Sequence, residues 1–395
     1  MSKFLYYISD LFVFWNLKKI SNGHLILIDS RGKKYSFGNT ENSLKAKIKI
    51  IDPSFCYKIL RKGSAGLGES YMNGQFETND LTSLIELTAK NIKTTYKFSG
   101  FFEFAFLKNF LNRNVFKNTK VRSKKNISLH YDLGNDFFST WLDSTLTYSC
   151  GIFNSSKETL EQAQINKYNK LINMVKPKKG DKILEIGCGW GGFAEFIAKK
   201  YNIELDCITI SKKQFLFTKE RIRKAKLTNK VNVQMLDYRD IKKKYDIIVS
   251  IEMIEAVGEK YLNEYFKVIK ENLSAGGRSA IQAIVIKDDL YDRYKLKEDF
   301  IQKYIFPGGF LPSKKSLNKI SDKSGLKIDE YHSYGSHYSS TLQRWRESFL
   351  NSWDSISKQG FNQSFKKMWD FYFSYCDAGF KSKNIDLVQF LLCNK

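Results

Sequence analysis

The sequence lacks any apolar run that approaches the roughly 18 residues needed to span a membrane. The longest candidate, residues 4–17, is interrupted by Ser9 and Asp10, and it lacks the basic start and small-residue cleavage site of a secretory signal. The six cysteines are scattered without CxxC spacing, which argues against a disulfide framework and favours a reducing cytoplasm. The four histidines are also dispersed, and the nearest pair, His332 and His337, lacks metal-ligand spacing, so no metal site is predicted.

Negative charge is scarce relative to positive charge. The 395 residues include 65 Lys+Arg and 41 Asp+Glu, a net charge of +24. One interpretation is a polyanionic partner, either nucleic acid or the phosphate surface of a membrane. The other is codon bias, because only 11 of the 65 basic residues are arginine. Hydrophobic content of 42% and aromatic content of 15% exclude disorder as the main state, and the length predicts two or three domains.

Residues 1–116 have the pattern of a small α+β domain. We expect an amphipathic helix, a hairpin, a further strand and a helical segment at residues 1–20, 25–38, 44–51 and 54–93, the last interrupted by glycines at 63–68. Residues 101–116 carry five phenylalanines before Leu111, with basic side chains beside them. This segment fits a core helix, and it also fits an interfacial helix that inserts rings into lipid. Residues 117–126 are interpreted as a basic linker.

Residues 127–395 have the pattern of a larger catalytic domain in which strands and helices alternate. Five short apolar strands are predicted at residues 182–186, 205–210, 231–236, 246–251 and 279–286. Gly276 and Gly277 are expected to form the turn into the last of them. Such alternation with short links is typical of an α/β, Rossmann-like fold with a mostly parallel sheet and helices on both faces.

A glycine-rich turn follows the first of these strands. Glu185 lies near the carboxyl end of the strand, and Gly187 and Gly189 let the backbone pass close to a ligand. The turn lacks the Lys-Ser/Thr ending of a Walker loop. No acid ends the second strand, as it would at a dinucleotide site, because Thr209 and Ser211 stand there. The pattern fits S-adenosylmethionine better than a pyrophosphate and indicates a methyltransferase.

Several uncommon motifs occur in one order along the chain. They are His130 to Phe138 (HYDLGNDFF), Tyr148 to Cys150 (YSC), Leu184 to Gly192 (LEIGCGWGG), Thr209 to Gln214, Asp237 to Asp240, Lys303 to Gly309 and Tyr372 to Phe380, with Gly66 to Met72 nearer the N-terminus. On these motifs the sequence resembles the cyclopropane-fatty-acyl-phospholipid synthase family. The resemblance covers the chain from about residue 125 to its end, and it implies a class I methyltransferase fold.

The resemblance implies a cytoplasmic enzyme that works at the inner face of the membrane without spanning it. Such an enzyme would transfer the methyl carbon of S-adenosylmethionine to a cis double bond of an unsaturated phospholipid acyl chain. A carbocation on the chain would then close to a cyclopropane. The expected partner is therefore the bilayer surface and not nucleic acid, the cations that matter are those near residues 101–126, and relatives suggest a homodimer.

The resemblance also implies a cofactor site at the strand ends. Most of the residues carried over lie at or just beyond the carboxyl ends of predicted strands, and one earlier segment would close over the cofactor. They are Tyr148, Ser149, Glu185, Gly187, Cys188, Gly189, Gly191, Thr209, Ile210, Gln214, Tyr238 and Arg239.

In relatives, the base that removes a proton is thought to be a bound bicarbonate. Its ligands would carry over to the backbone of Cys150 and to Glu255 and Tyr338, the last in a loop rich in Tyr, Ser and His. One departure is Gln282, which replaces an anion-binding histidine of the family and can neither carry positive charge nor relay a proton. Bicarbonate binding and ring closure are therefore in question. Ring formation is still preferred over the alternative, a methyl- or methylene-branched product.

Cys376 matches a cysteine once regarded as catalytic in the family. A nucleophilic thiolate needs a cationic neighbour, and the sequence supplies Asp377 instead. Cys376 is therefore interpreted as a pocket residue beside the reaction centre.

Two other classes of protein are weighed against this one. An RNA or protein methyltransferase would fit the charge and the shared core, although it would not need the Phe-rich segment or the Tyr-Ser-Cys motif. An inactive lipid-binding protein would lose Glu185, the glycine turn and Glu255, yet all of these are present.

Overall fold

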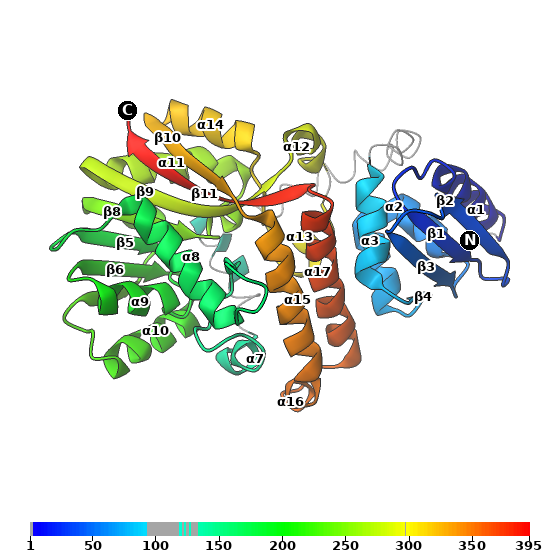
Figure 1. Ribbon diagram of the computed structural model, residues 1–395, viewed down its shortest axis with the longest axis horizontal. Helices are drawn as coiled ribbons and strands as arrows, with labels where there is room; N and C mark the ends of the chain where they lie inside the picture. The colour runs from blue at the N-terminus through cyan, green and yellow to red at the C-terminus, as the bar shows by residue number, and fades with distance from the viewer. Residues whose placement is uncertain (1–2, 93–117, 121, 124–125, 128–132, 297) are drawn as a thin grey trace. The chain divides into compact units, whose positions relative to one another are not determined.

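The computed structural model describes residues 3–92, 118–120, 122–123, 126–127, 133–296 and 298–395 (Figure 1). The chain forms two compact units. The first comprises Met1–Val115, Asp292–Ile305 and Trp353–Asn384, and the second comprises Phe116–Tyr291, Phe306–Ser352 and Ile385–Lys395. The helix expected at 101–116 and the motif that begins at His130 lie outside the described residues, except for the end of that motif, and the linker at 117–126 is described only in part.

The first unit combines a small mixed sheet with helices. Its elements are α1 (Lys3–Leu17), β1 (His24–Ile28), β2 (Lys34–Gly38), β3 (Lys45–Ile50), α2 (Phe55–Met72), β4 (Phe76–Thr78), α3 (Leu81–Lys90), α13 (Phe300–Tyr304), α16 (Trp353–Ser357) and α17 (Gln363–Lys381). The strand order is β2-β1-β3-β4, with β1 antiparallel to β2 and parallel to β3. The expected helix, hairpin and third strand are confirmed. The expected break in the next helix is limited to Gly63, where φ is 57°, and α2 continues beyond it.

Two late segments of the chain belong to the first unit, whereas the sequence placed them in a continuous catalytic domain. Helices α13 and α17 pack on α2, and α17 also contacts α3. The ring of Phe371 lies 4.5 Å from that of Phe300 and 6.1 Å from that of Tyr71, measured between centroids. A Cβ at Gly68 would lie 2.2 Å from the Phe300 ring, so this close approach requires glycine. Periodicity reveals an apolar helix face but not the partner that covers it.

The second unit contains the larger sheet. Its elements are α7 (Asn135–Ser139), α8 (Leu160–Val175), β5 (Lys182–Ile186), α9 (Gly192–Lys200), β6 (Glu204–Thr209), α10 (Lys212–Lys224), β7 (Val231–Met235), β8 (Tyr245–Ile251), α11 (Leu262–Asn272), β9 (Leu273–Ile286), α14 (Lys314–Lys323), β10 (Leu326–Ser333), α15 (Gly335–Asn351) and β11 (Ile385–Asn394). Helix α12 (Asp288–Tyr294) crosses the chain boundary between the units.

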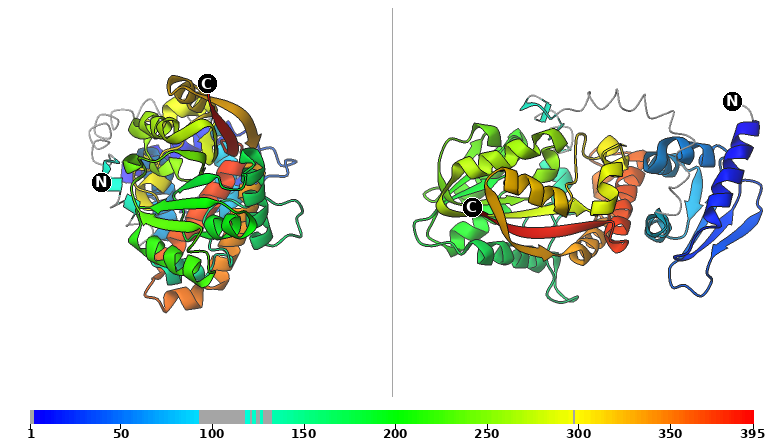
Figure 2. Two further views of the ribbon diagram at one scale, coloured as in Figure 1. Left: turned by 90° about the vertical axis from the view of Figure 1, so that its left-hand side faces the viewer. Right: turned by 90° about the horizontal axis from the view of Figure 1, so that it is seen from above.

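Seven strands form the sheet of the second unit in the order β10-β11-β9-β8-β5-β6-β7. Neighbours from β9 to β7 are parallel, and β11 runs antiparallel to both β9 and β10. Helices α8, α9 and α10 cover one face around buried side chains such as Leu171, Phe193 and Ile197, and α11 and α14 lie on the other face (Figures 1 and 2). The predicted α/β fold with a mostly parallel sheet is confirmed.

Two local expectations in the second unit are wrong, and two of its strands were not predicted. Strand β9 begins before Gly276 and Gly277, which cause a register shift against β8 and do not form a turn. The strands β10 and β11 were not predicted, because β10 is polar and β11 follows a long helix directly. Tyr338 lies in the first turns of α15 and not in a loop.

Candidate active site at the carboxyl ends of the parallel strands

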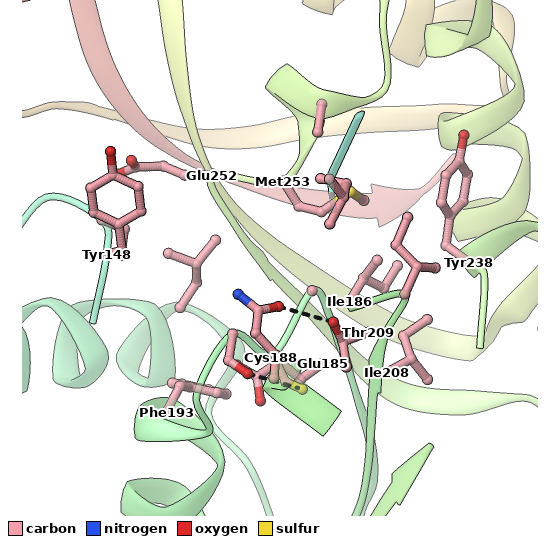
Figure 3. A pocket seen from close by; sticks show the side chains of 18 of the residues that line it. Tyr148, Glu185, Ile186, Cys188, Phe193, Ile208, Thr209, Tyr238, Glu252 and Met253 are labelled. Carbon is pink, nitrogen blue, oxygen red and sulfur yellow. Dashed lines mark hydrogen bonds between the residues drawn. The ribbon is translucent and has the colours of Figure 1, made fainter. Parts of the chain in front are cut away.

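A cavity opens at the carboxyl ends of β5, β6 and β8 in the second unit (Figure 3). Parallel strands end at one edge of a sheet, and ligands of open α/β sheets bind there. Of the predicted cofactor residues, those that line the cavity are Tyr148, Ser149, Glu185, Gly187, Cys188, Gly189, Thr209, Ile210, Gln214, Tyr238 and Arg239. Tyr148 and Glu252 lie at one end of the cavity, and Tyr238 lies at the other (Figure 3).

The glycine turn brings the backbone to the wall of the cavity. Gly187 and Gly189 have φ angles of 83° and 53°, a region that side chains with a Cβ rarely adopt. No atom lies within 4 Å of a Cβ built on Gly189, so its missing side chain leaves space for a ligand. Gly191 does not line the cavity, because it precedes α9 and its Cβ would lie 2.6 Å from Thr218.

Glu185 places a buried acid beside this turn. Its side chain is 3% exposed, and the Cys207 thiol lies 3.6 Å from its Oε2. Burial raises the pKa of Glu185 from 4.5 to about 7, although the Cys207 contact and the charges of Lys167 and Arg221 oppose the rise. A cationic ligand in the cavity would favour the ionised form.

The other end of the cavity is lined by polar groups that hold one another in place. Thr209 Oγ1 donates a hydrogen bond to Gln214 Oε1 over 3.0 Å (Figure 3). Arg239 pairs with Asp237, whose Oδ1 and Oδ2 accept from Nε at 2.8 Å and from Nη2 at 2.7 Å. The hydrogen bonds and charge of Arg239 outweigh burial and lower the pKa of Asp237. Asp237 lines the cavity but was not among the predicted site residues.

The segment before α8 carries the Tyr-Ser-Cys motif. The Tyr148 ring packs among Phe138, Trp141 and Trp345, with centroid distances of 5.3, 5.7 and 5.2 Å. Ser149 accepts a hydrogen bond of 2.7 Å from Nζ of the fully buried Lys167. Burial lowers the pKa of Lys167 to about 8, and nearby acids, Glu252 foremost, oppose the shift.

Glu252, directly after β8, is the centre of a second group of residues. Its Oε1 accepts hydrogen bonds from the Cys150 backbone N–H at 2.9 Å and from Gln282 Nε2 at 2.7 Å. Its Oε2 accepts from the Tyr338 hydroxyl at 2.6 Å. The backbone φ of Glu252 is +50°, a conformation that costs a residue with a side chain about 1 kcal/mol. This backbone turn directs the carboxylate to three donors that are distant in sequence.

Gln282 is held in one orientation. Its Oε1 accepts a 2.8 Å hydrogen bond from Gln389 Nε2 on β11, which leaves its Nε2 to face Glu252. Gln282 and Gln389 are directly paired across β9 and β11, and both are fully buried. The antiparallel strand therefore positions a donor at the active site.

Glu255, one turn after Glu252, is the weaker acid of the two. Its Oε1 accepts from the Ile284 N–H at 2.6 Å, while its buried Oε2 has no partner within the described chain. Burial and the repulsion from Glu252 raise the pKa of Glu255 to about 8. Burial also raises the pKa of Glu252, but the hydrogen bonds from Tyr338 and its other donors oppose this. Because Glu252 has the donors, Glu252 holds the negative charge and Glu255 holds the proton.

The residues expected to bind bicarbonate therefore surround a side chain of the protein itself. Cys150, Gln282 and Tyr338 all donate to Glu252, and Glu255 bonds to the backbone of Ile284 instead. A second anion at this position would have no donor of this set available and would be repelled by a carboxylate. The arrangement does not fit bicarbonate.

Cys376 lies on α17 in the first unit, and it is not among the residues that line the cavity. Burial, together with the negative charges of Asp299 and Asp377, raises the pKa of its thiol. A thiolate is therefore disfavoured at this position. The expected place of Cys376 beside the reaction centre stays a prediction.

Two buried charged residues at the site were not predicted, Glu252 and Lys167. The available signal for Glu252 was an acid directly after a parallel strand, but the resemblance assigned the role to Glu255, three positions later. For Lys167 the signal was a lysine on the apolar face of α8, beside Gln164 and Tyr168.

Within the ranges that the structure describes, no group of three or more metal-binding side chains is found. In the same ranges, no helix is both long enough and apolar enough to cross a membrane.

The comparisons with known proteins agree with this geometry. Residues 118–390 match the model of the family described as mycolic acid cyclopropane synthetase. The chain is 34% identical over 343 residues to tuberculostearic acid methyltransferase of Mycobacterium tuberculosis, covering 85% of this chain and 80% of that protein. It is 33% identical over 357 residues to cyclopropane-fatty-acyl-phospholipid synthase of Escherichia coli K12, covering 88% and 87%.

Solved structures show the same fold. The crystal structure of a mycolic acid cyclopropane synthase complexed with SAH and CTAB superimposes with a TM-score of 0.65 and 26% identity, covering 69% of this chain and 98% of that one. Relatives of this kind imply S-adenosylmethionine as the co-substrate and a class I methyltransferase core. The chain therefore belongs to the mycolic acid cyclopropane synthetase family, and it is an S-adenosylmethionine-dependent methyltransferase similar to cyclopropane-fatty-acyl-phospholipid synthases.

Proposed function

We propose that this protein adds the methyl carbon of S-adenosylmethionine to the cis double bond of an unsaturated phospholipid acyl chain and that Glu252 is the base. The observation that carries the proposal is the Glu252 carboxylate, which lines the cavity and accepts hydrogen bonds from Cys150, Gln282 and Tyr338. The lipid substrate is supported by relatives named for fatty-acyl phospholipid and tuberculostearic acid chemistry.

The residues around the cavity fit the co-substrate. When bound, S-adenosylmethionine supplies an electrophilic methyl group on a cationic sulfur. The acid of Glu185 would balance its positive charge, and the bare Cα of Gly189 leaves room for it along the turn. Thr209 and Gln214 offer hydroxyl and amide groups to a ribose, and the Tyr238 ring offers a flat surface to an adenine.

The chemistry needs a base that is already charged. The π electrons of the alkene form a bond to the methyl carbon, the bond from that carbon to sulfur breaks, and a chain carbon becomes a cation. Glu252 then accepts a proton from the added carbon, and the electron pair of that C–H bond closes the three-membered ring. Its three donors and Lys167 stabilise the carboxylate form before reaction, so no reorganisation is needed at that moment.

A branched product is the second candidate. The observation that favours it is the replacement of a diffusible anion and a histidine by Glu252 and Gln282. A tethered carboxylate reaches only the substrate protons close to its fixed position. If a hydride shift first moves the cation to the methylated carbon, loss of a proton from the added carbon gives a methylene branch. Loss of a proton from a neighbouring chain carbon gives a methyl branch beside a double bond.

Expression in a host without such activity is expected to convert unsaturated phospholipids into species heavier by one CH₂, as detected by mass spectrometry of extracted lipids. Cyclopropane protons in the NMR spectrum would support the ring, whereas retained unsaturation would support the branched product. Lipids that stay unchanged, while the purified protein methylates RNA or protein, would overturn the proposal.

Replacement of Glu252 by glycine is expected to lower kcat on unsaturated phospholipid at least about 100-fold, because the base is lost. Glycine suits the positive φ at this position, so folding is preserved. Formate or bicarbonate should then restore part of the activity by occupying the three freed donors, while the wild-type protein should not respond to either anion. The matched control is Glu264→Gln on the exposed face of α11. Wild-type activity that depends on added bicarbonate would contradict this role.

The affinity for S-adenosylmethionine is expected to weaken as the pH falls through about 7. The pKa of Glu185 in the free protein is about 7, and a cation binds better to the ionised acid, so affinity should approach a tenfold loss per pH unit well below that value. Calorimetric titration between pH 5.5 and 7 measures this dependence, and Glu185→Gln should bind weakly with a nearly flat profile. An equally steep profile in the variant would assign the titration to another group.

A further inference from the structure

Helix α1 in the first unit carries a continuous apolar stripe on its solvent-facing side. Phe4, Tyr7, Ile8 and Leu11 are 69%, 50%, 43% and 53% exposed. Their spacing of three and four residues places them on one face of the helix. Five of the nine large hydrophobic side chains that are exposed in the described chain lie on this one helix, the fifth being Trp15. Exposed apolar residues scattered singly are ordinary, but a contiguous patch marks an interaction surface.

A face of α1 next to this stripe anchors the helix to the rest of the first unit. Phe14 is buried, with its ring 4.8 Å from that of Tyr35 and 6.3 Å from that of Phe37 on β2. The Tyr6 ring lies 5.9 Å from that of Tyr57 on α2. The helix therefore buries one face in the unit already, and the stripe is a second apolar face.

Charge identifies the partner that suits this surface. Lys3 and Lys18 are exposed at the two ends of the stripe, and Lys19 Nζ lies 3.4 Å from the centroid of the Trp15 ring. The single acid of the helix, Asp10, is half-buried and has a raised pKa, first because of burial. An apolar stripe with cations at its ends matches the boundary between acyl chains and anionic head groups.

Size argues against other occupants. A standard protein interface uses roughly 20–30 residues a side, far more than this stripe supplies. A helix of 15 residues is only about 22 Å long, shorter than the ~30 Å hydrocarbon layer, so it would lie in the plane of the surface.

We propose that α1 docks this protein on anionic phospholipid bilayers, with Phe4, Tyr7, Ile8 and Leu11 in the acyl boundary and Lys3 and Lys18 at the phosphates. The proposal rests on the proposed function, because an enzyme whose substrate is a bilayer lipid must reach the membrane surface. The sequence predicts possible lipid contact for the small domain at residues 1–116 and places the relevant cations near residues 101–126, and α1 assigns the contact to one helix of that domain.

The test uses the full-length protein and vesicles of phosphatidylcholine with or without phosphatidylglycerol. The variant Phe4→Glu/Leu11→Glu is expected to cosediment at least about tenfold less than the wild type with the mixed vesicles. The control Leu216→Glu makes the same chemical change at an apolar side chain of α10 that is 55% exposed, and it should bind like the wild type. Lys3→Ala/Lys18→Ala should lose affinity only for vesicles that contain phosphatidylglycerol.

Activity measurements separate this proposal from the enzymatic one. The double glutamate variant should lose activity on vesicles yet retain it on the same lipid dispersed in detergent micelles. If the wild-type protein binds vesicles through α1 but alters no lipid, the docking proposal stands and the proposed enzymatic function is wrong. Docking by α1 would be overturned if the folded double glutamate variant bound vesicles as well as the wild type does. It would also be overturned if that variant changed from dimer to monomer without losing vesicle binding.

Discussion

The Glu252 carboxylate is the group on which the rest of the active site depends. A charge at the wall of a partly enclosed cavity is stable only when donors replace the water it has lost. Here the donors come from Cys150 before α8, Gln282 on β9 and Tyr338 on α15. These three groups are brought to one point by the sheet order, the antiparallel strand β11 and the start of α15.

Charge is distributed around the cavity so that the three acids differ in protonation state. Glu252 has three donors and the nearby cation of Lys167, which favour its ionised form, whereas Glu255 has a single backbone donor and a pKa of about 8. Glu185 lies beside the glycine turn with a pKa of about 7, ready to ionise when a cation binds. Acids held in different states by their surroundings can perform different tasks within one pocket.

The fold and the cavity at the strand ends could be predicted from the sequence, because both follow from local pattern. Short apolar strands and a turn containing Gly187 and Gly189 specify a parallel sheet and a ligand edge without knowledge of distant contacts. The Glu252 group could not be predicted in this way, since its donors lie 102, 30 and 86 residues away along the chain. The place of α17 in the first unit was not predicted for the same reason, because the packing of Phe371 on Phe300 leaves no local signal.

The most direct test of the central claim is a crystal structure of the protein with S-adenosylhomocysteine, grown in buffer saturated with bicarbonate. The account predicts that the Glu252 carboxylate lies between Cys150, Gln282 and Tyr338 and that no anion occupies this position. A bicarbonate bonded to these three groups, with the Glu252 side chain turned away, would contradict it.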